Sequence, residues 1–154
     1  MTYTAREGRE QILAEMHEAA AALMGAQEAL GGAYELLDDQ SADRLESELY
    51  TPVGSATKAA LSACASFSAR YGFEQAKPEA GEHVARMRGE GAREMIDAAT
   101  ALVGKADAVL AGLQDSMLPV EVGDQELREN LSAIRRTLAP LGGAARELER
   151  TLGR

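Results

Sequence analysis

The stretch that decides the fold is QILAEMHEAAAALMGAQEALGGAYELL, residues 11–37. Its core-facing positions recur in steps of three and four without a break, and this spacing predicts a long amphipathic α-helix with a coiled-coil-like seam. The seam consists of Leu13, Met16, Ala20, Leu23, Gln27, Leu30, Tyr34 and Leu37. Thr4 and Glu7 fit a capping box ahead of it. We therefore expect the first helix to run from about Thr4 to Asp38.

A second helix is expected over about 42–71, with a break near residue 51. Ser41 is a candidate N-cap, and Thr51 followed by Pro52 fits a second N-cap and the first position of a helix. The part before the break extends the apolar stripe of the part after it. Gly72 is well placed to end the helix, because glycine readily adopts the left-handed conformation of a C-terminal cap.

Two more helices are expected over about 78–116 and 124–152. Pro78 can open the third helix at its first position, and Asp124 can cap the fourth. The apolar seam of the fourth helix keeps its phase through Pro140, which predicts a kinked helix that continues past the proline.

Four long helices with short connections predict an all-α fold with a single domain over residues 1–154. The specific arrangement that we expect is an elongated four-helix up-and-down antiparallel bundle with coiled-coil-like heptad packing. Residues 1–40 carry a net charge of −6 and residues 123–154 a net charge of +1, so the first and last helices are expected to be complementary neighbours.

Composition excludes several classes of function. The net charge of −9 disfavours binding to nucleic acids and to anionic membranes. The first residues lack the apolar segment of a signal peptide, so we expect a cytoplasmic protein. The single cysteine, Cys64, excludes an internal disulfide. Abundant Ala, Gly and Arg suggest a bacterial genome rich in G and C.

The sequence offers no convincing catalytic or metal-binding constellation. Di-iron helical bundles use a Glu-x-x-His motif, and neither His17 nor His83 has a glutamate three residues before it. Cys64 lies among small residues in mid-helix, as a buried packing residue does. Glu79 and His83 are spaced like a helical surface ion pair. We expect no cofactor, no metal and no enzymatic activity.

The favoured function is protein–protein interaction or assembly through Ala- and Leu-rich helix faces. Two apolar rows lie beside the main seams, and they can serve either as the second contact face of a bundle helix or as an interaction face. That candidate face consists of Ile12, Ala19, Ala26, Ile96, Val103 and Leu110. The expected partner is a second copy, giving a homodimer, or another helical protein.

The alternative function is that of a bundle that binds or senses a small apolar ligand between its helices. Gln27 is the polar residue on the first seam, and Tyr34 follows it on the same face. Both would line such a pocket. Gln27 also fits a structural role, as a buried polar residue that fixes helix register.

Overall fold

The computed structural model describes residues 4–76 and 91–152, and all regular secondary structure in these residues is helical. The predicted all-α class is therefore confirmed. None of the described helices is long and apolar enough to cross a membrane.

The first helix, α1, runs from Ala5 to Glu35. The Thr4 hydroxyl accepts a hydrogen bond from the Glu7 backbone N–H at 3.1 Å, which confirms the predicted N-cap. The helix ends three residues before the expected end at Asp38, because Asp38 is itself extended and caps the next helix. Its carboxylate, and not the Ser41 side chain, accepts the first hydrogen bond of that helix.

The second segment is a continuous helical column of three parts: α2 (Asp39–Leu45), a π-helical turn η1 (Glu46–Tyr50) and α3 (Thr51–Tyr71). The expected N-cap at Thr51 is wrong, because Thr51 is fully helical and its N–H bonds to the Glu46 carbonyl; near residue 51 the column changes from the π turn to the α-helix without leaving the helical state. A proline in a regular α-helix conflicts with the carbonyl four residues before it. The wider π turn relieves that conflict for Pro52, so the column continues through it.

The third helix, α4, runs from Ala92 to Asp115 and is preceded by Gly91, which is extended. The helix therefore begins later than expected, and its predicted start at Pro78 lies outside the described residues, as do Glu79 and His83. A short helix that was not predicted, α5 (Leu118–Glu121), follows α4.

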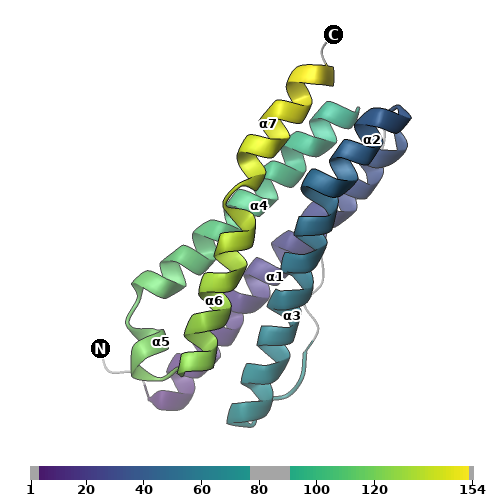
Figure 1. The fold of residues 1–154 in the computed structure, drawn as a ribbon. Helices are drawn as coiled ribbons and strands as arrows, with labels where there is room; N and C mark the ends of the chain where they lie inside the picture. Colours follow the sequence, from purple (N-terminus) through teal and green to yellow (C-terminus); the bar gives the residue numbers. More distant parts are fainter. Residues whose placement is uncertain (1–3, 77–90, 153–154) are drawn as a thin grey trace.

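The last segment divides into α6 (Gln125–Leu138) and α7 (Leu141–Leu152). Asp124 caps α6 as predicted, accepting from the Leu127 N–H at 2.8 Å. Pro140 interrupts the backbone ladder, so the expected single kinked helix is observed as two helices. Their apolar phase is preserved, and both belong to one column (Figure 1).

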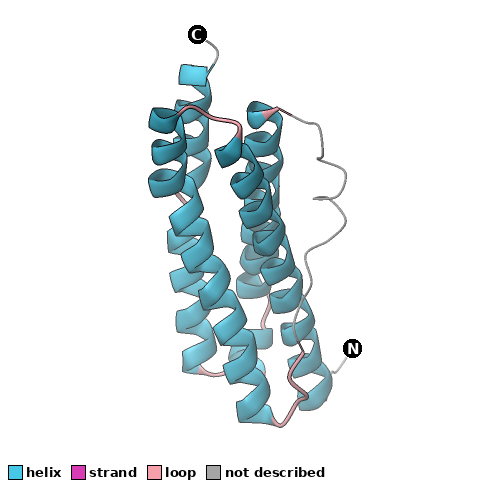
Figure 2. Ribbon diagram, turned by 90° about the vertical axis from the view of Figure 1, so that its right-hand side faces the viewer, coloured by secondary structure: helices cyan, strands magenta, loops and turns pink. Residues whose placement is uncertain are grey.

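The described helices form four columns around a shared core: α1, α2–η1–α3, α4 and α6–α7 (Figures 1 and 2). The column of α1 packs most extensively on α4 and next on α3, while α6 packs on both α3 and α4. The expected pairing of the first and last helices is therefore wrong, because these two columns lie diagonally across the core.

Contacts between the columns fix their directions. Gly25 of α1 lies against Leu102 of α4, and Gly32 lies against Met95, so α1 and α4 are antiparallel. Arg70 near the end of α3 pairs with Asp124 at the start of α6.

The columns α1 and α6–α7 consequently run one way, and α3 and α4 run the other way. In the expected up-and-down bundle consecutive helices alternate in direction, and α3 and α4 do not. The physical reason is that α3 ends and α4 begins at opposite ends of the molecule, so these two helices cannot form an antiparallel hairpin with each other.

Small residues explain how closely α1 and α4 approach. A Cβ added at Gly25 would lie 3.1 Å from the Leu102 Cδ1, and one added at Gly32 would lie 3.0 Å from the Met95 Sδ. Both distances are tighter than ordinary van der Waals contact. The glycines therefore allow large side chains of α4 to lie directly on the backbone of α1.

Candidate functional site

The six residues of the predicted interaction face are buried in the core of their own chain. None exposes more than 8% of its surface, and α1 and α4 cover each other's apolar rows. The residues are Ile12, Ala19, Ala26, Ile96, Val103 and Leu110. The interpretation of these rows as a free interaction face is therefore wrong, and they form the second contact face of each helix.

Gln27 and Tyr34 do not line a common pocket. The Gln27 side chain packs over Gly54 of α3, where an added Cβ would lie 3.2 Å from its Nε2. Tyr34 is 39% exposed and faces a hollow on the outside of the molecule. The predicted pocket thus does not form around these two residues.

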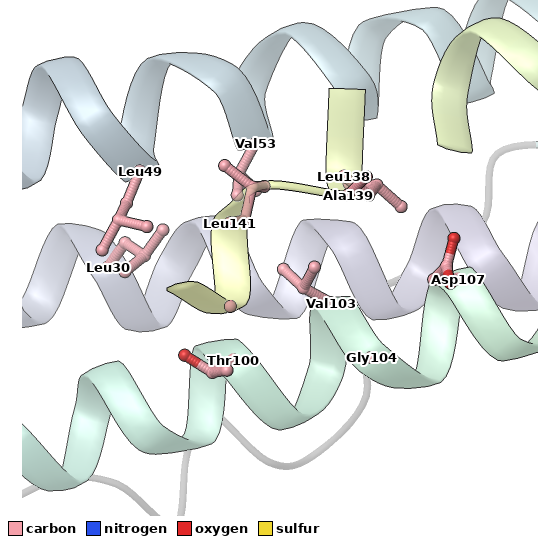
Figure 3. A pocket seen from close by; sticks show the side chains of 11 residues that line it. Leu30, Leu49, Val53, Thr100, Val103, Gly104, Asp107, Leu138, Ala139 and Leu141 are labelled. Atoms are coloured by element: carbon pink, nitrogen blue, oxygen red, sulfur yellow. The ribbon is translucent and has the colours of Figure 1, made fainter. Parts of the chain in front are cut away.

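A different cavity lies between the columns, beside the break that separates α6 from α7 (Figure 3). Its volume is about 200 Å³. All four columns contribute to its wall, which is mostly aliphatic. The lining residues are Leu30, Leu49, Val53, Thr100, Val103, Gly104, Asp107, Leu138, Ala139, Leu141 and Gly142.

Backbone chemistry explains why this space is empty. Pro140 has no N–H to donate and ends the regular ladder of α6, which separates Leu138 from Leu141 at the cavity wall. Gly104 and Gly142 face the cavity without side chains. A Cβ added at Gly104 would meet no atom within 4 Å and Gly104 is exposed, so the cavity opens to solvent on this side.

Two polar side chains lie along the α4 wall of the cavity (Figure 3). The Thr100 hydroxyl donates to the Ile96 carbonyl at 2.8 Å. The Asp107 carboxylate accepts from the Arg135 Nε at 2.9 Å and Nη2 at 3.3 Å, and the same arginine donates to the Gln114 side chain. The hydrogen bond to Asp107 raises the pKa of Arg135.

The cavity therefore has an apolar body and a neutralised ion pair at its edge. It offers volume and shape for a ligand, and no described nucleophile or acid–base pair is aimed into it.

Groups that could perform chemistry elsewhere are poorly placed for it. Burial raises the pKa of the Cys64 thiol to about 12, which keeps the thiol protonated and unreactive. Over the described ranges, no group of three or more His, Cys, Asp or Glu side chains could hold a metal ion. His17 is half-buried on α1, and its Nε2 has no described hydrogen-bond partner.

A polar junction at the other end of the columns is structural. Asp124 accepts hydrogen bonds from the Arg70 Nε at 2.8 Å and Nη2 at 3.0 Å, and from the Tyr71 hydroxyl at 2.8 Å. Arg9 of α1 lies over the Tyr71 ring, 4.1 Å from its centroid, and donates to the Val122 carbonyl. The junction joins the ends of α1, α3 and α6.

A second polar contact joins α4 to α7. Burial raises the pKa of Glu149 to about 7, and a hydrogen bond and charge repulsion from Asp97 act in the same direction. Arg93 opposes this shift, and its Nη2 donates to the Glu149 carbonyl at 2.8 Å. Protonation of Glu149 removes its charge repulsion with Asp97.

Sequence reasoning missed the cavity residues because the apolar seam continues in phase across Pro140. The available signal was the succession of Pro140, Gly142 and Gly143 in one column, opposite Gly104 in another. Comparisons with protein-family models, curated proteins and solved structures gave no match.

Proposed function

We propose that this protein is a non-enzymatic binding protein that holds a small apolar molecule in the cavity beside the α6–α7 break. The observation that carries the proposal is an aliphatic space of about 200 Å³ to which all four columns contribute. An apolar cavity of roughly 150 Å³ is enough to bind benzene. A ligand of comparable or slightly larger size fits this protein.

The composition of the wall supports an apolar ligand over a charged one. Leucine and valine side chains from all four columns would surround the ligand, and burial of apolar surface would stabilise it by about 25 cal/mol per Å². Asp107 is already paired with Arg135. A charged ligand would have to break that pair or remain without a partner, and both are unfavourable.

The test is ligand binding before and after the cavity is filled. Benzene or toluene, titrated into the protein, should shift the methyl NMR signals of the lining leucines and valines and raise the thermal midpoint of unfolding. Gly104→Leu should place a side chain into the cavity and abolish both effects.

The matched control is Gly112→Leu on the same helix, because an added Cβ there also meets no atom within 4 Å and Gly112 does not line the cavity. The proposal fails if the probes bind Gly104→Leu as well as they bind the unaltered protein, or if they do not bind at all.

Assembly with a second copy or with another helical protein is the second candidate function. The observation that favours it is the exposure of Met117 and Val120, whose exposed fractions are 59% and 63%, around α5 at one end of the columns. Light scattering over a dilution series should show a dimer that Val120→Asp dissociates. A monomer at every concentration would exclude self-association.

We also propose that the columns form a four-helix bundle with coiled-coil-like heptad packing. The support is the burial of residues spaced by three and four along the last column: Leu127, Leu131, Ile134, Leu138, Leu141, Ala145 and Leu148. The cytoplasmic location and the lack of nucleic-acid and membrane partners stay predictions from the sequence.

A further inference from the structure

A second hollow lies on the outside of the molecule, where the end of α1 meets the π-helical turn. Its volume is about 340 Å³, and it is lined by Gly31, Tyr34, Glu35, Glu46 and Tyr50. The apolar cavity shares none of these residues. The two spaces therefore can be occupied and altered independently.

Two aromatic rings form part of the wall of this hollow. Tyr34 is one of the large apolar side chains that the described surface exposes. Tyr50 is half-buried against the core, and its Cε2 would lie 3.9 Å from a Cβ added at Gly31. The missing side chain at Gly31 thus leaves room beside the Tyr50 ring.

The electrostatic environment of the hollow is negative. Glu35 and Glu46 both line it, and neither forms an ion pair with another described residue. The C-terminal end of α1 adds the negative end of a helix dipole, and its last turn carries no basic residue. The chain as a whole carries a net charge of −9, which attracts cations from solution.

The π-helical turn brings two of the wall residues together. Glu46 and Tyr50 are the first and last residues of η1. Residues four apart lie on the same side of such a turn, so Glu46 and Tyr50 both line the hollow. Such turns are uncommon and are found frequently at functional sites.

We propose that this hollow binds a small organic cation of the quaternary ammonium or methylated amine class. Aromatic faces attract such cations through the ring quadrupole, and nearby carboxylates add long-range attraction. A bare metal ion fits less well, because no group of three ligating side chains is found in the part of the chain that the structure describes. The proposal does not depend on the apolar cavity.

The experiment compares choline with 3,3-dimethyl-1-butanol, which has the same shape and no charge. Choline, titrated at low ionic strength, should shift the ring NMR signals of Tyr34 and Tyr50 with a saturable dependence on concentration. The neutral molecule should bind at least about tenfold more weakly. Equal binding of the two molecules would overturn the proposal, because it would show that charge plays no part.

Variants identify the site. Tyr34→Leu should weaken choline binding by about 2- to 30-fold, the range expected for a cation–π contact. Tyr34 is exposed, so this change leaves the core intact. Glu46→Gln should also weaken binding, and its effect should shrink at high salt.

The matched control is Glu28→Gln, an exposed position on α1 that removes the same charge outside the hollow. An equal loss of affinity in Glu28→Gln and Glu46→Gln would reduce the effect to general charge attraction and overturn the proposed site. Gly104→Leu should leave choline binding unchanged, so a failure of the apolar cavity is distinguishable from a failure of the cation site.

Discussion

Asp124 is expected to contribute measurably to the stability of the fold, because its side chain joins two helices, α6 and α3. It caps α6 through the Leu127 N–H and accepts hydrogen bonds from Arg70 and Tyr71 of α3. Two substitutions separate these roles. Asp124→Asn keeps a capping side chain and removes the charge, whereas Asp124→Ala removes both.

The pKa of Asp124 determines how much its charge contributes to the free energy of folding. Burial alone would raise this pKa, but hydrogen bonds from Arg70, the Leu127 amide and Tyr71 outweigh burial and lower it from 3.8 to about 2. A difference of this size corresponds to about 2 kcal/mol of folding free energy. Because 27% of the side chain is exposed, solvent screening reduces the expected contribution to about 1–2 kcal/mol.

The lowered pKa determines how the stabilisation by Asp124 depends on pH. The folded state holds the carboxylate ionised more strongly than the unfolded state does, so the contribution is complete above about pH 4 and is lost as the pH falls toward about 2. At neutral pH we expect Asp124→Asn to lower the free energy of unfolding by about 1–2 kcal/mol. Asp124→Ala should cost about 1 kcal/mol more, because the cap is also lost.

Urea-induced unfolding, followed by the helical circular dichroism signal at several pH values, measures both effects. Glu129→Gln on the same helix is the control, because its described contact is with Gln125 within α6. This role of Asp124 is refuted if Asp124→Asn is as stable as the unaltered protein at neutral pH. It is also refuted if Asp124→Asn loses as much stability as the unaltered protein does between about pH 4 and pH 2.

Two other titrating groups give further predictions. Burial, with Asp97 nearby, raises the pKa of Glu149 from 4.5 to about 7, so this group should make the protein less stable as the pH rises through that interval. The midpoint temperature of thermal unfolding should not fall over this pH interval in Glu149→Gln, and at about pH 8 it should be higher than in the unaltered protein. A variant whose midpoint falls with pH as much as that of the unaltered protein would contradict this prediction. Cys64, with its pKa of about 12, should react with iodoacetamide only after unfolding in urea, and rapid alkylation of the native protein would show that the thiol is accessible.

Local signals in the sequence predicted local structure well. Thr4 and Asp124 cap helices as expected, and Gly72 ends α3 with a φ of 74°. The Phe73 N–H closes that end by bonding to the Ser68 carbonyl at 2.9 Å. Each of these features depends on a few neighbouring residues, so one stretch of sequence contains all the information needed.

The partners of the helices could not be read from the same patterns. A spacing of three and four shows that the row of Ile12 or Ile96 is apolar, and it does not show whether the chain itself covers that row. Gly25 and Gly32 allow α4 to pack closely on α1. In the sequence, however, glycine within a helix can equally indicate a position where the helix is destabilised. The burial of the predicted interaction face therefore depends on tertiary contacts.

The proposed sites escaped prediction for a similar reason. The cavity depends on Pro140 in one column and Gly104 in another, which are distant in sequence. The outer hollow depends on a π turn, which the sequence pattern around Pro52 does not distinguish from a helix start. Tyr34 alone was identified from its position on the seam, and its predicted pocket partner Gln27 instead contacts Gly54.

The chain consists of two antiparallel helical hairpins, α1 with α2–η1–α3 and α4 with α6–α7. The most extensive helix contact, between α1 and α4, joins one hairpin to the other. Cleavage between Tyr71 and Ala92 would turn the core into a subunit interface, and folding would then depend on the concentration of both pieces. The covalent link thus acts by keeping the two halves at a high effective concentration.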